Sequence, residues 1–210
     1  MPDRKILDLS YDSETKNKII SVATKLFALK GYSTVSTRDI AGAVGINIAS
    51  VYYYFESKEA LLEDILNQIE KGYRHYYDWL INENKKAESL EEFMDNIFNN
   101  ELLEMADPMV CLGVSLAIKE QHNNVRAQKI VLELLTDYSI KSIQAGFDGL
   151  VEKGIIQPTD TKTIATLLVF SALAINDLRM HMYLGDEPTA DYTEMYANIR
   201  KYITAALKKE

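Results

Sequence analysis

Apolar residues recur three and four positions apart along most of the chain, and this spacing is typical of helices that bury one face. Alternation of apolar and polar residues, which marks a half-buried strand, is scarce. Glycine and proline fall mostly between the periodic stretches. The pattern predicts an all-α fold with helices over about 13–30, 37–44, 48–54, 57–84, 89–105, 108–121, 123–153, 159–184 and 191–208.

Three helices near the N-terminus have recognisable start and stop signals. Gly31 and Gly45 are expected to end the first two, because the left-handed conformation that often follows a helix costs least for glycine. Ser36 is expected to begin the second helix with Asp39 as its capping-box partner, and Asn47 to cap the third. These signals predict a small three-helix head at the N-terminus.

Residues 36–55 have the form of a helix-turn-helix. Ala41 is small enough to let two helices cross closely, Gly45 makes the turn, and Ile46 and Val51 close a small core. Small side chains at the start of the second helix would let it lie deep in a DNA major groove. The residues that this helix is expected to project outward are Ala49, Ser50, Tyr53 and Tyr54.

The distribution of charge changes the meaning of the net charge. The whole chain carries −8, which by itself argues against a nucleic-acid partner. Residues 14–58, however, hold six basic and three acidic side chains, or +3, whereas residues 59–210 hold 15 basic and 25 acidic ones, or −10. The sequence therefore predicts a mildly basic head on an acidic body.

Several features predict a cytoplasmic protein with no membrane partner. The chain has a single cysteine, Cys111, and its N-terminus lacks the apolar stretch of a secretion signal. The longest apolar run, 164–175, is broken by Thr166 and Ser171 and is too short to span a bilayer.

The N-terminal segment closely resembles the TetR family of transcriptional regulators over residues 15–66, with no gap needed. The resemblance implies a DNA-binding domain over 1–58, which a long helix joins to a ligand-binding and dimerisation domain over 59–210. The motifs that carry it are Leu26-Phe27 followed by Gly31-Tyr32, Arg38-Asp39-Ile40-Ala41, Gly45-Ile46, Val51-Tyr52-Tyr53-Tyr54-Phe55 and Lys58-Glu59-Ala60-Leu61-Leu62.

The same resemblance implies a set of DNA-binding residues. Those at the start of the second helix would approach the DNA backbone or a groove edge, and Lys58 would meet a phosphate at the start of the fourth helix. Many relatives have lysine or glutamine where this chain has Ile48, so base readout would rest on few side chains and on DNA shape. The full set is Thr37, Arg38, Asn47, Ile48, Ala49, Ser50, Tyr53, Tyr54 and Lys58.

Several of these residues could have a structural role instead of contacting DNA. The tyrosines could pack between helices, and this is the favoured interpretation for Tyr52, which is expected to face the fourth helix. Lys58 could be a solvated surface lysine, and Arg38 could form an ion pair with a nearby carboxylate.

The body offers candidates for an apolar effector pocket, although core packing explains any single one of them as well. A stripe over 164–175, including Leu167 and Leu168, could form a four-helix interface with a second subunit or be buried within the chain. The ligand-binding candidates are Tyr73, Tyr77, Trp79, Met94, Phe98, Met105, Met109, Tyr138, Phe147, Phe170 and Asn176.

The predicted function is ligand-responsive transcriptional regulation, most simply repression. A homodimer would bind a palindromic operator in double-stranded DNA and be released by a small, lipophilic effector. The alternatives are a small-molecule-binding helical module, or a helical enzyme, without operator binding. The sequence has no phosphate-binding loop, dinucleotide fingerprint or nucleophile elbow and no His or Cys pattern typical of metal sites, so no enzymatic activity, cofactor or metal is predicted.

Overall fold

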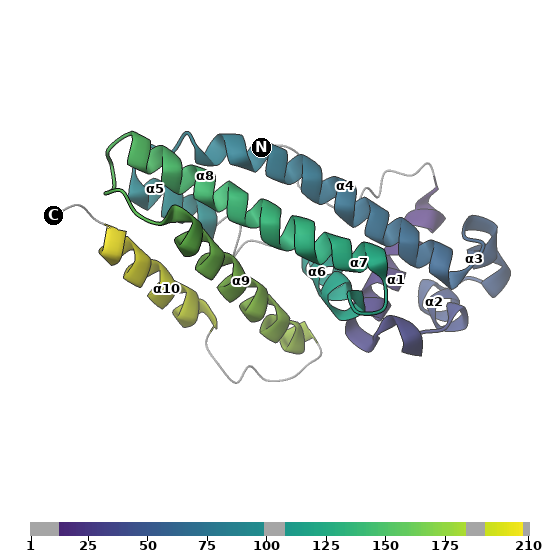
Figure 1. The fold of residues 1–210 in the computed structure, drawn as a ribbon. Helices are drawn as coiled ribbons and strands as arrows, with labels where there is room; N and C mark the ends of the chain where they lie inside the picture. The colour runs from purple at the N-terminus through teal and green to yellow at the C-terminus, as the bar shows by residue number, and fades with distance from the viewer. Residues whose placement is uncertain (1–12, 99–107, 184–191, 208–210) are drawn as a thin grey trace. The chain divides into compact units, whose positions relative to one another are not determined.

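The computed structural model describes residues 13–98, 108–183 and 192–207, and within these ranges every regular element is helical (Figure 1). The all-α prediction is therefore confirmed. The elements are α1 (Glu14–Lys30), η1 (Tyr32–Thr34), α2 (Thr37–Val44), α3 (Ile48–Tyr54), α4 (Lys58–Asn84), α5 (Leu90–Asp95), α6 (Pro108–Glu120), α7 (Val125–Lys129), η3 (Ile130–Tyr138), α8 (Ser139–Glu152), α9 (Thr161–Tyr183) and α10 (Tyr192–Leu207).

Two predicted helices differ from the observed ones in kind. The stretch predicted as one helix over 123–153 is helical from 125 to 152, but η3 in its middle is a π-helix of nine residues. The helix predicted over 89–105 begins as α5, continues as a π turn at 96–98, and has its predicted end outside the described residues. The spacing of apolar residues in a π-helix is close to that in an α-helix, so the periodicity of the sequence did not distinguish the two kinds of helix.

The chain forms two compact units. The first unit comprises residues 1–75 and 108–134, and the second comprises 76–107 and 135–210, within the described ranges. Of the three divisions between the units, those at 75/76 and 134/135 fall inside continuous helical stretches, α4 and η3. The predicted boundary between residues 58 and 59 separates a DNA-binding domain from a ligand-binding domain. It does not coincide with a boundary between these compact units, and it stays a prediction.

The core of the first unit joins α1, α2, α3, α4 and α6. Val51, which was predicted to close a small core, is confirmed as buried, whereas Ile46 is only half-buried, as is Leu26 of α1. Gly113 of α6 lies against Ile69 of α4, since an added Cβ atom would sit 3.1 Å from the Ile69 side chain. The buried apolar residues of α1, α2 and α3 include Ile19, Ile20, Ala23, Phe27, Ile40, Ala41, Val44 and Val51.

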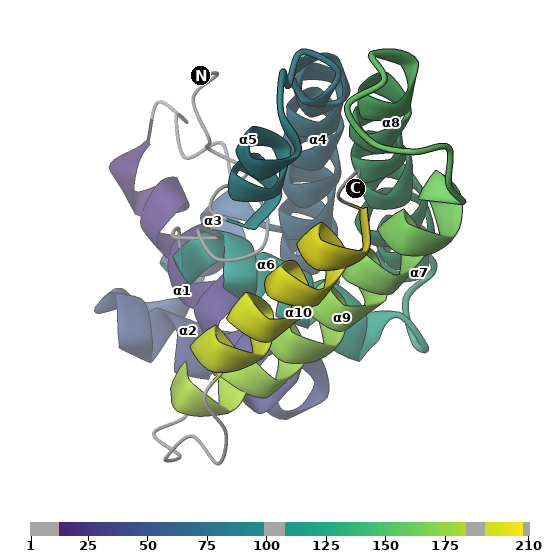
Figure 2. The same cartoon turned by 90° about the vertical axis from the view of Figure 1, so that its left-hand side faces the viewer.

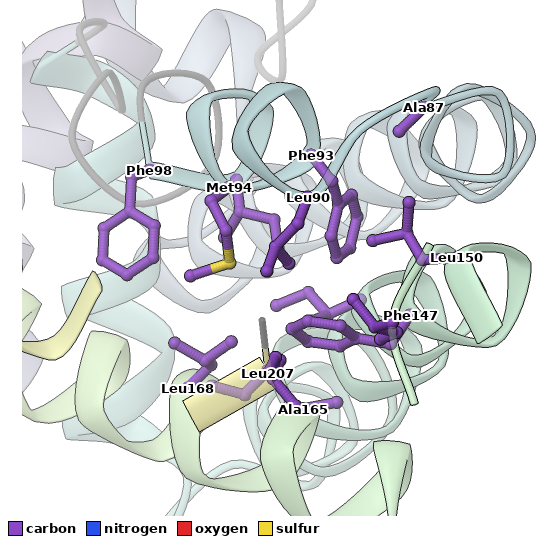
Figure 3. Packing of buried hydrophobic residues seen from close by; sticks show 14 of the residues in the cluster. Ala87, Leu90, Phe93, Met94, Phe98, Phe147, Leu150, Ala165, Leu168 and Leu207 are labelled. Atoms are coloured by element: carbon purple, nitrogen blue, oxygen red, sulfur yellow. The ribbon is translucent and has the colours of Figure 1, made fainter. Parts of the chain in front are cut away.

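The core of the second unit gathers side chains from α5, α8, α9 and α10 (Figure 3). Phe93 and Phe147 meet edge to face, with ring centroids 4.9 Å apart. Gly146 permits this contact, because a Cβ atom there would lie 2.0 Å from the Phe93 ring. Helices α9 and α10 run side by side over this core (Figure 2).

In the part of the chain that the structure describes, no helix combines the length and the apolar character needed to cross a membrane.

Candidate nucleic-acid interface

Local capping fixes the start and end of α2 as the sequence predicted. The Ser36 hydroxyl accepts a hydrogen bond from the Asp39 amide at 3.2 Å, and the Asp39 carboxylate accepts one from the Ser36 amide at 2.8 Å. The hydrogen bond from the Ser36 hydroxyl, followed by that from its amide, lowers the pKa of Asp39. Gly45 ends the helix in the left-handed conformation, with φ 82° and ψ 32°.

The start of α3 is capped by Asn47, also as predicted. Its side-chain oxygen accepts hydrogen bonds from the amide of Ser50 at 2.8 Å and from the Ser50 hydroxyl at 3.0 Å. Two predicted DNA contacts thus bond to each other and fix the first turn of α3. The Ser50 oxygen keeps lone pairs that can still accept a hydrogen bond.

One side of α3 is buried and the other is exposed. Val51 is 2% exposed, whereas Tyr53 is 82% exposed and Ile48 and Ala49 also lie at the surface. Packing does not explain a tyrosine that is four-fifths exposed. Tyr53 therefore remains a strong candidate for contact with another molecule.

Tyr54 is tied to the first helix of the same unit. Its hydroxyl accepts a hydrogen bond from the Ser13 hydroxyl at 2.8 Å, and Ser13 is the residue that caps α1. Its ring meets the Tyr53 ring edge to face, with centroids 5.0 Å apart. Tyr54 thus orients the end of α3 whether or not it also contacts DNA.

A hollow of about 430 Å³ lies among the starts of α2, α3 and α4. It brings together four of the predicted DNA-binding residues, but it also includes Tyr52, which is 50% exposed rather than packed as predicted. The four-residue spacing of Ile48 and Tyr52 puts both on one helix face and could have revealed this. The lining residues are Ser36, Thr37, Arg38, Ile48, Tyr52 and Lys58.

Lys58 contacts the connection between α1 and α2. Its ammonium donates to the backbone oxygens of Tyr32 at 3.0 Å and Val35 at 2.9 Å, and lies 4.1 Å from the centroid of the Tyr32 ring. Burial, followed by the nearby Glu59 carboxylate, raises the pKa of Tyr32. Sequence reasoning placed Lys58 at this face but missed Tyr32 as its partner.

Most of the predicted effector-binding residues that the structure describes are packed. Met94, Phe98 and Phe147 belong to the core of the second unit (Figure 3). Tyr77 is buried and its hydroxyl accepts a hydrogen bond from the Ser139 hydroxyl at 2.6 Å. Tyr73 is buried in the first unit.

The remaining candidates are partly exposed or outside the description. Trp79 and Tyr138 are half-buried, and Phe170 is 55% exposed on α9. Met105 and the side chains of Met109 and Asn176 lie outside the described residues. A hollow of about 410 Å³ in the second unit is polar and includes none of the predicted residues; its lining is Lys85, Lys141, Gln144, Ala145, Asp148, Gly149, Glu152 and Lys153.

Helix α9 presents two different apolar faces. Leu168 and Ile175 are buried in the core, with Ile164 and Ala172 packed against it. Leu167 is 62% exposed and Phe170 is 55% exposed. Ala174 is exposed as well, and the three residues share one helix face, because they are three and seven positions apart. The neighbouring α10 exposes Met195 and Tyr202, so the predicted stripe divides between intrachain core and surface.

Residues 19–65 match the model of the tetR family of bacterial regulatory proteins. The chain is 32% identical over 85 residues to the "probable HTH-type transcriptional regulator YttP" of Bacillus subtilis, covering 40% of this chain and 41% of that protein. It is 36% identical over 90 residues to IcaR of Staphylococcus aureus, the HTH-type negative transcriptional regulator of the biofilm operon, covering 40% and 44%. The chain thus spans less than half the length of these curated relatives.

The fold as a whole is similar to that of solved bacterial proteins. A protein from Saccharomonospora viridis, solved in complex with choline, has a TM-score of 0.69 at 18% identity, over 95% of this chain and all of that one. At this identity the likeness concerns the fold alone. It extends the similarity beyond the N-terminal segment that the sequence matches cover.

Proposed function

We propose that this chain is a transcriptional repressor of the TetR family that binds a palindromic operator as a homodimer, because residues 19–65 match the tetR family model and the relatives similar to this segment are named as transcriptional regulators. A small-molecule effector releases it, and it acts in the cytoplasm, where the DNA is. The observation that carries the proposal is the exposed face of α3, where Tyr53 is 82% exposed and where Tyr52 lines a hollow together with Thr37 and Arg38.

The chemistry of this face suits a DNA duplex. Arg38 is exposed at the start of α2, where the helix N-terminus also favours a phosphate. Ala49 leaves room for α3 to enter the major groove. Ile48 is 39% exposed and can contact only apolar groups such as a thymine methyl, so sequence is read by few side chains and by DNA shape.

The exposed apolar face of α9 and α10 supports the homodimer. Leu167, Phe170 and Tyr202 are each more than half exposed, and no charged residue occurs between 163 and 175. A contiguous apolar surface of this kind is typical of a protein interface. A two-fold axis through it would pair two recognition helices, as a palindromic operator requires.

The effector is proposed to bind in the second unit, near Met94, Phe98 and Phe147. These aromatic and methionine side chains suit a lipophilic ligand, which would have to replace contacts that the core now makes. The relative IcaR is named as a negative regulator, and the protein from Saccharomonospora viridis holds choline. The first supports repression, and the second supports the binding of a small molecule.

The test of operator binding is selection of bound duplexes from a random DNA library at fixed salt. Wild type is expected to enrich one palindrome, and the double variant Arg38→Ala, Tyr53→Ala is expected to enrich none. Lys25→Ala is the control, because it removes an exposed positive charge from α1, outside the proposed face. No enrichment by wild type, or equal enrichment by the double variant, would contradict the proposal.

A further inference from the structure

The segment between α1 and α2 is held from two sides within the first unit. Tyr32 lies at its centre: its amide donates to the Glu120 carboxylate of α6 at 3.2 Å, and its backbone oxygen accepts from the Lys58 ammonium of α4 at 3.0 Å. Its ring packs against Phe27 of α1, with ring centroids 5.1 Å apart. Three helices therefore determine where this one residue lies.

Helix α6 makes a second polar contact with the same region. The Lys119 ammonium donates to the backbone oxygen of Ala28 at 2.6 Å, in the last turn of α1. Carbonyls in the last turn lack partners within the helix, and a cation there also interacts favourably with the helix dipole. Adjacent residues of α6 thus bond to the backbone on both sides of the end of α1.

The held segment leads directly into the DNA-binding face. Val35 is 2% exposed, accepts a hydrogen bond from Lys58 at 2.9 Å, and precedes Ser36, the residue that caps α2. Thr37 and Arg38 follow at once and line the hollow. A displacement of Tyr32 would therefore move the start of α2.

We propose that Glu120 and Lys119 of α6 are positioning residues for DNA binding. By holding residues 28–35 against Lys58, they place the N-terminus of α2 so that Thr37 and Arg38 meet the phosphates. A buried carboxylate that accepts an amide hydrogen bond is suited to this task, because a hydrogen bond to a charged group contributes more than one between neutral groups. Glu120 is 9% exposed and contacts no DNA itself. The inference rests on the proposed operator binding.

The test compares Glu120→Ala, Glu120→Gln and Gln121→Ala on the palindrome that wild type enriches. Glu120→Ala removes the acceptor and is expected to weaken binding about tenfold, because a hydrogen bond to a charged group is lost. Glu120→Gln retains an acceptor oxygen and should restore affinity to within about threefold of wild type. Gln121→Ala is the matched control, since its side-chain amide donates to the nearby Ile118 oxygen of α6 at 2.8 Å.

Salt dependence separates positioning from a general loss of stability. If Arg38 no longer meets its phosphate, the slope of log affinity against log salt should become shallower by about one in Glu120→Ala. Loss of folded protein would lower the apparent affinity without changing the slope. Lys119→Met provides a second variant, because an exposed lysine can be replaced with little risk to folding, and about a threefold loss is expected.

The outcomes distinguish this inference from the proposed function. If wild type binds the palindrome while Glu120→Ala and Lys119→Met bind it equally well and with the same slope, the positioning role is wrong and the repressor proposal stands. If wild type enriches no duplex, the proposed function fails, and this inference fails with it.

Discussion

Two surfaces of this molecule expose aromatic side chains, and their surroundings differ. On α3 of the first unit, Tyr52 is 50% exposed and lines a hollow together with Arg38, at the start of α2, and Lys58. On α9 of the second unit, Phe170 stands among apolar residues, with no charge between 163 and 175. Exposure alone therefore says little about the partner. The neighbouring cations and helix ends favour a polyanion at one surface, and their absence within 163–175 favours protein at the other.

The largest effect is expected from a charge placed on the α9 surface. Phe170→Asp should turn the proposed homodimer into a monomer, because the carboxylate would have to be buried without a partner. Affinity for a full palindrome should fall by about 100-fold or more, since the two half-sites would be bound separately. Light scattering after gel filtration reports the mass. An unchanged dimer would show that α9 is not the interface; Lys162→Ala, also exposed on α9 outside the apolar run, is the control.

Substitutions at the proposed DNA-binding face are expected to have a smaller effect, which lowers affinity for DNA but leaves dimerisation unchanged. Arg38→Ala and Tyr53→Ala should each cost about 1–3 kcal/mol of binding free energy, the range for single DNA contacts. Both variants should remain dimeric, and Arg38→Ala should also reduce the salt slope by about one. Fluorescence anisotropy with the enriched duplex measures both quantities. Loss of the dimer in either variant would contradict the assignment of α3 to DNA binding and of α9 to dimerisation.

A substitution in α8 tests the core packing of the second unit separately from the DNA-binding face. In Gly146→Ala the new methyl group would overlap the Phe93 ring, and strain of this kind costs about 1–3 kcal/mol of stability. Urea denaturation gives the free energy of unfolding. Gly42→Ala is the control, because nothing lies within 4 Å of a Cβ atom added there. Equal stability of the two variants would contradict the close approach of α5 and α8.

The smallest expected effect is on the pH dependence of stability. The pKa of Asp39 is lowered in the folded state by hydrogen bonds from Ser36, so its contribution to stability is present above the unfolded pKa of about 4. That contribution is lost as pH falls through the lower, folded value. Asp39→Asn should therefore narrow the difference in stability between pH 6 and pH 3. Thermal unfolding at the two pH values measures it, and an unaltered difference would show that the capping box has no acid-sensitive part.

The head was predictable in detail because its signals are local. Ser36 with Asp39, Gly45 and Asn47 act within four residues of themselves, and each does in the structure what the sequence indicated. The exposed position of Tyr53 followed from helix periodicity around Val51.

The rest depended on contacts distant in sequence. Tyr32 and Glu120 are 88 residues apart, and no local pattern pairs a backbone amide with a remote carboxylate. On α9, apolar residues occupy both faces, so periodicity could not separate the buried Leu168 from the exposed Leu167. The π-helical stretch η3 also escaped prediction, because its hydrogen-bond pattern leaves little trace in residue type.

Hydrogen exchange with and without the enriched duplex tests most directly that the α2–α3 face is the DNA-binding surface. If this face binds the duplex, exchange should slow over residues 36–58 when the duplex is added, with little change over 161–175. Slower exchange over 161–175 alone, or no change over 36–58 at saturating duplex, would contradict it.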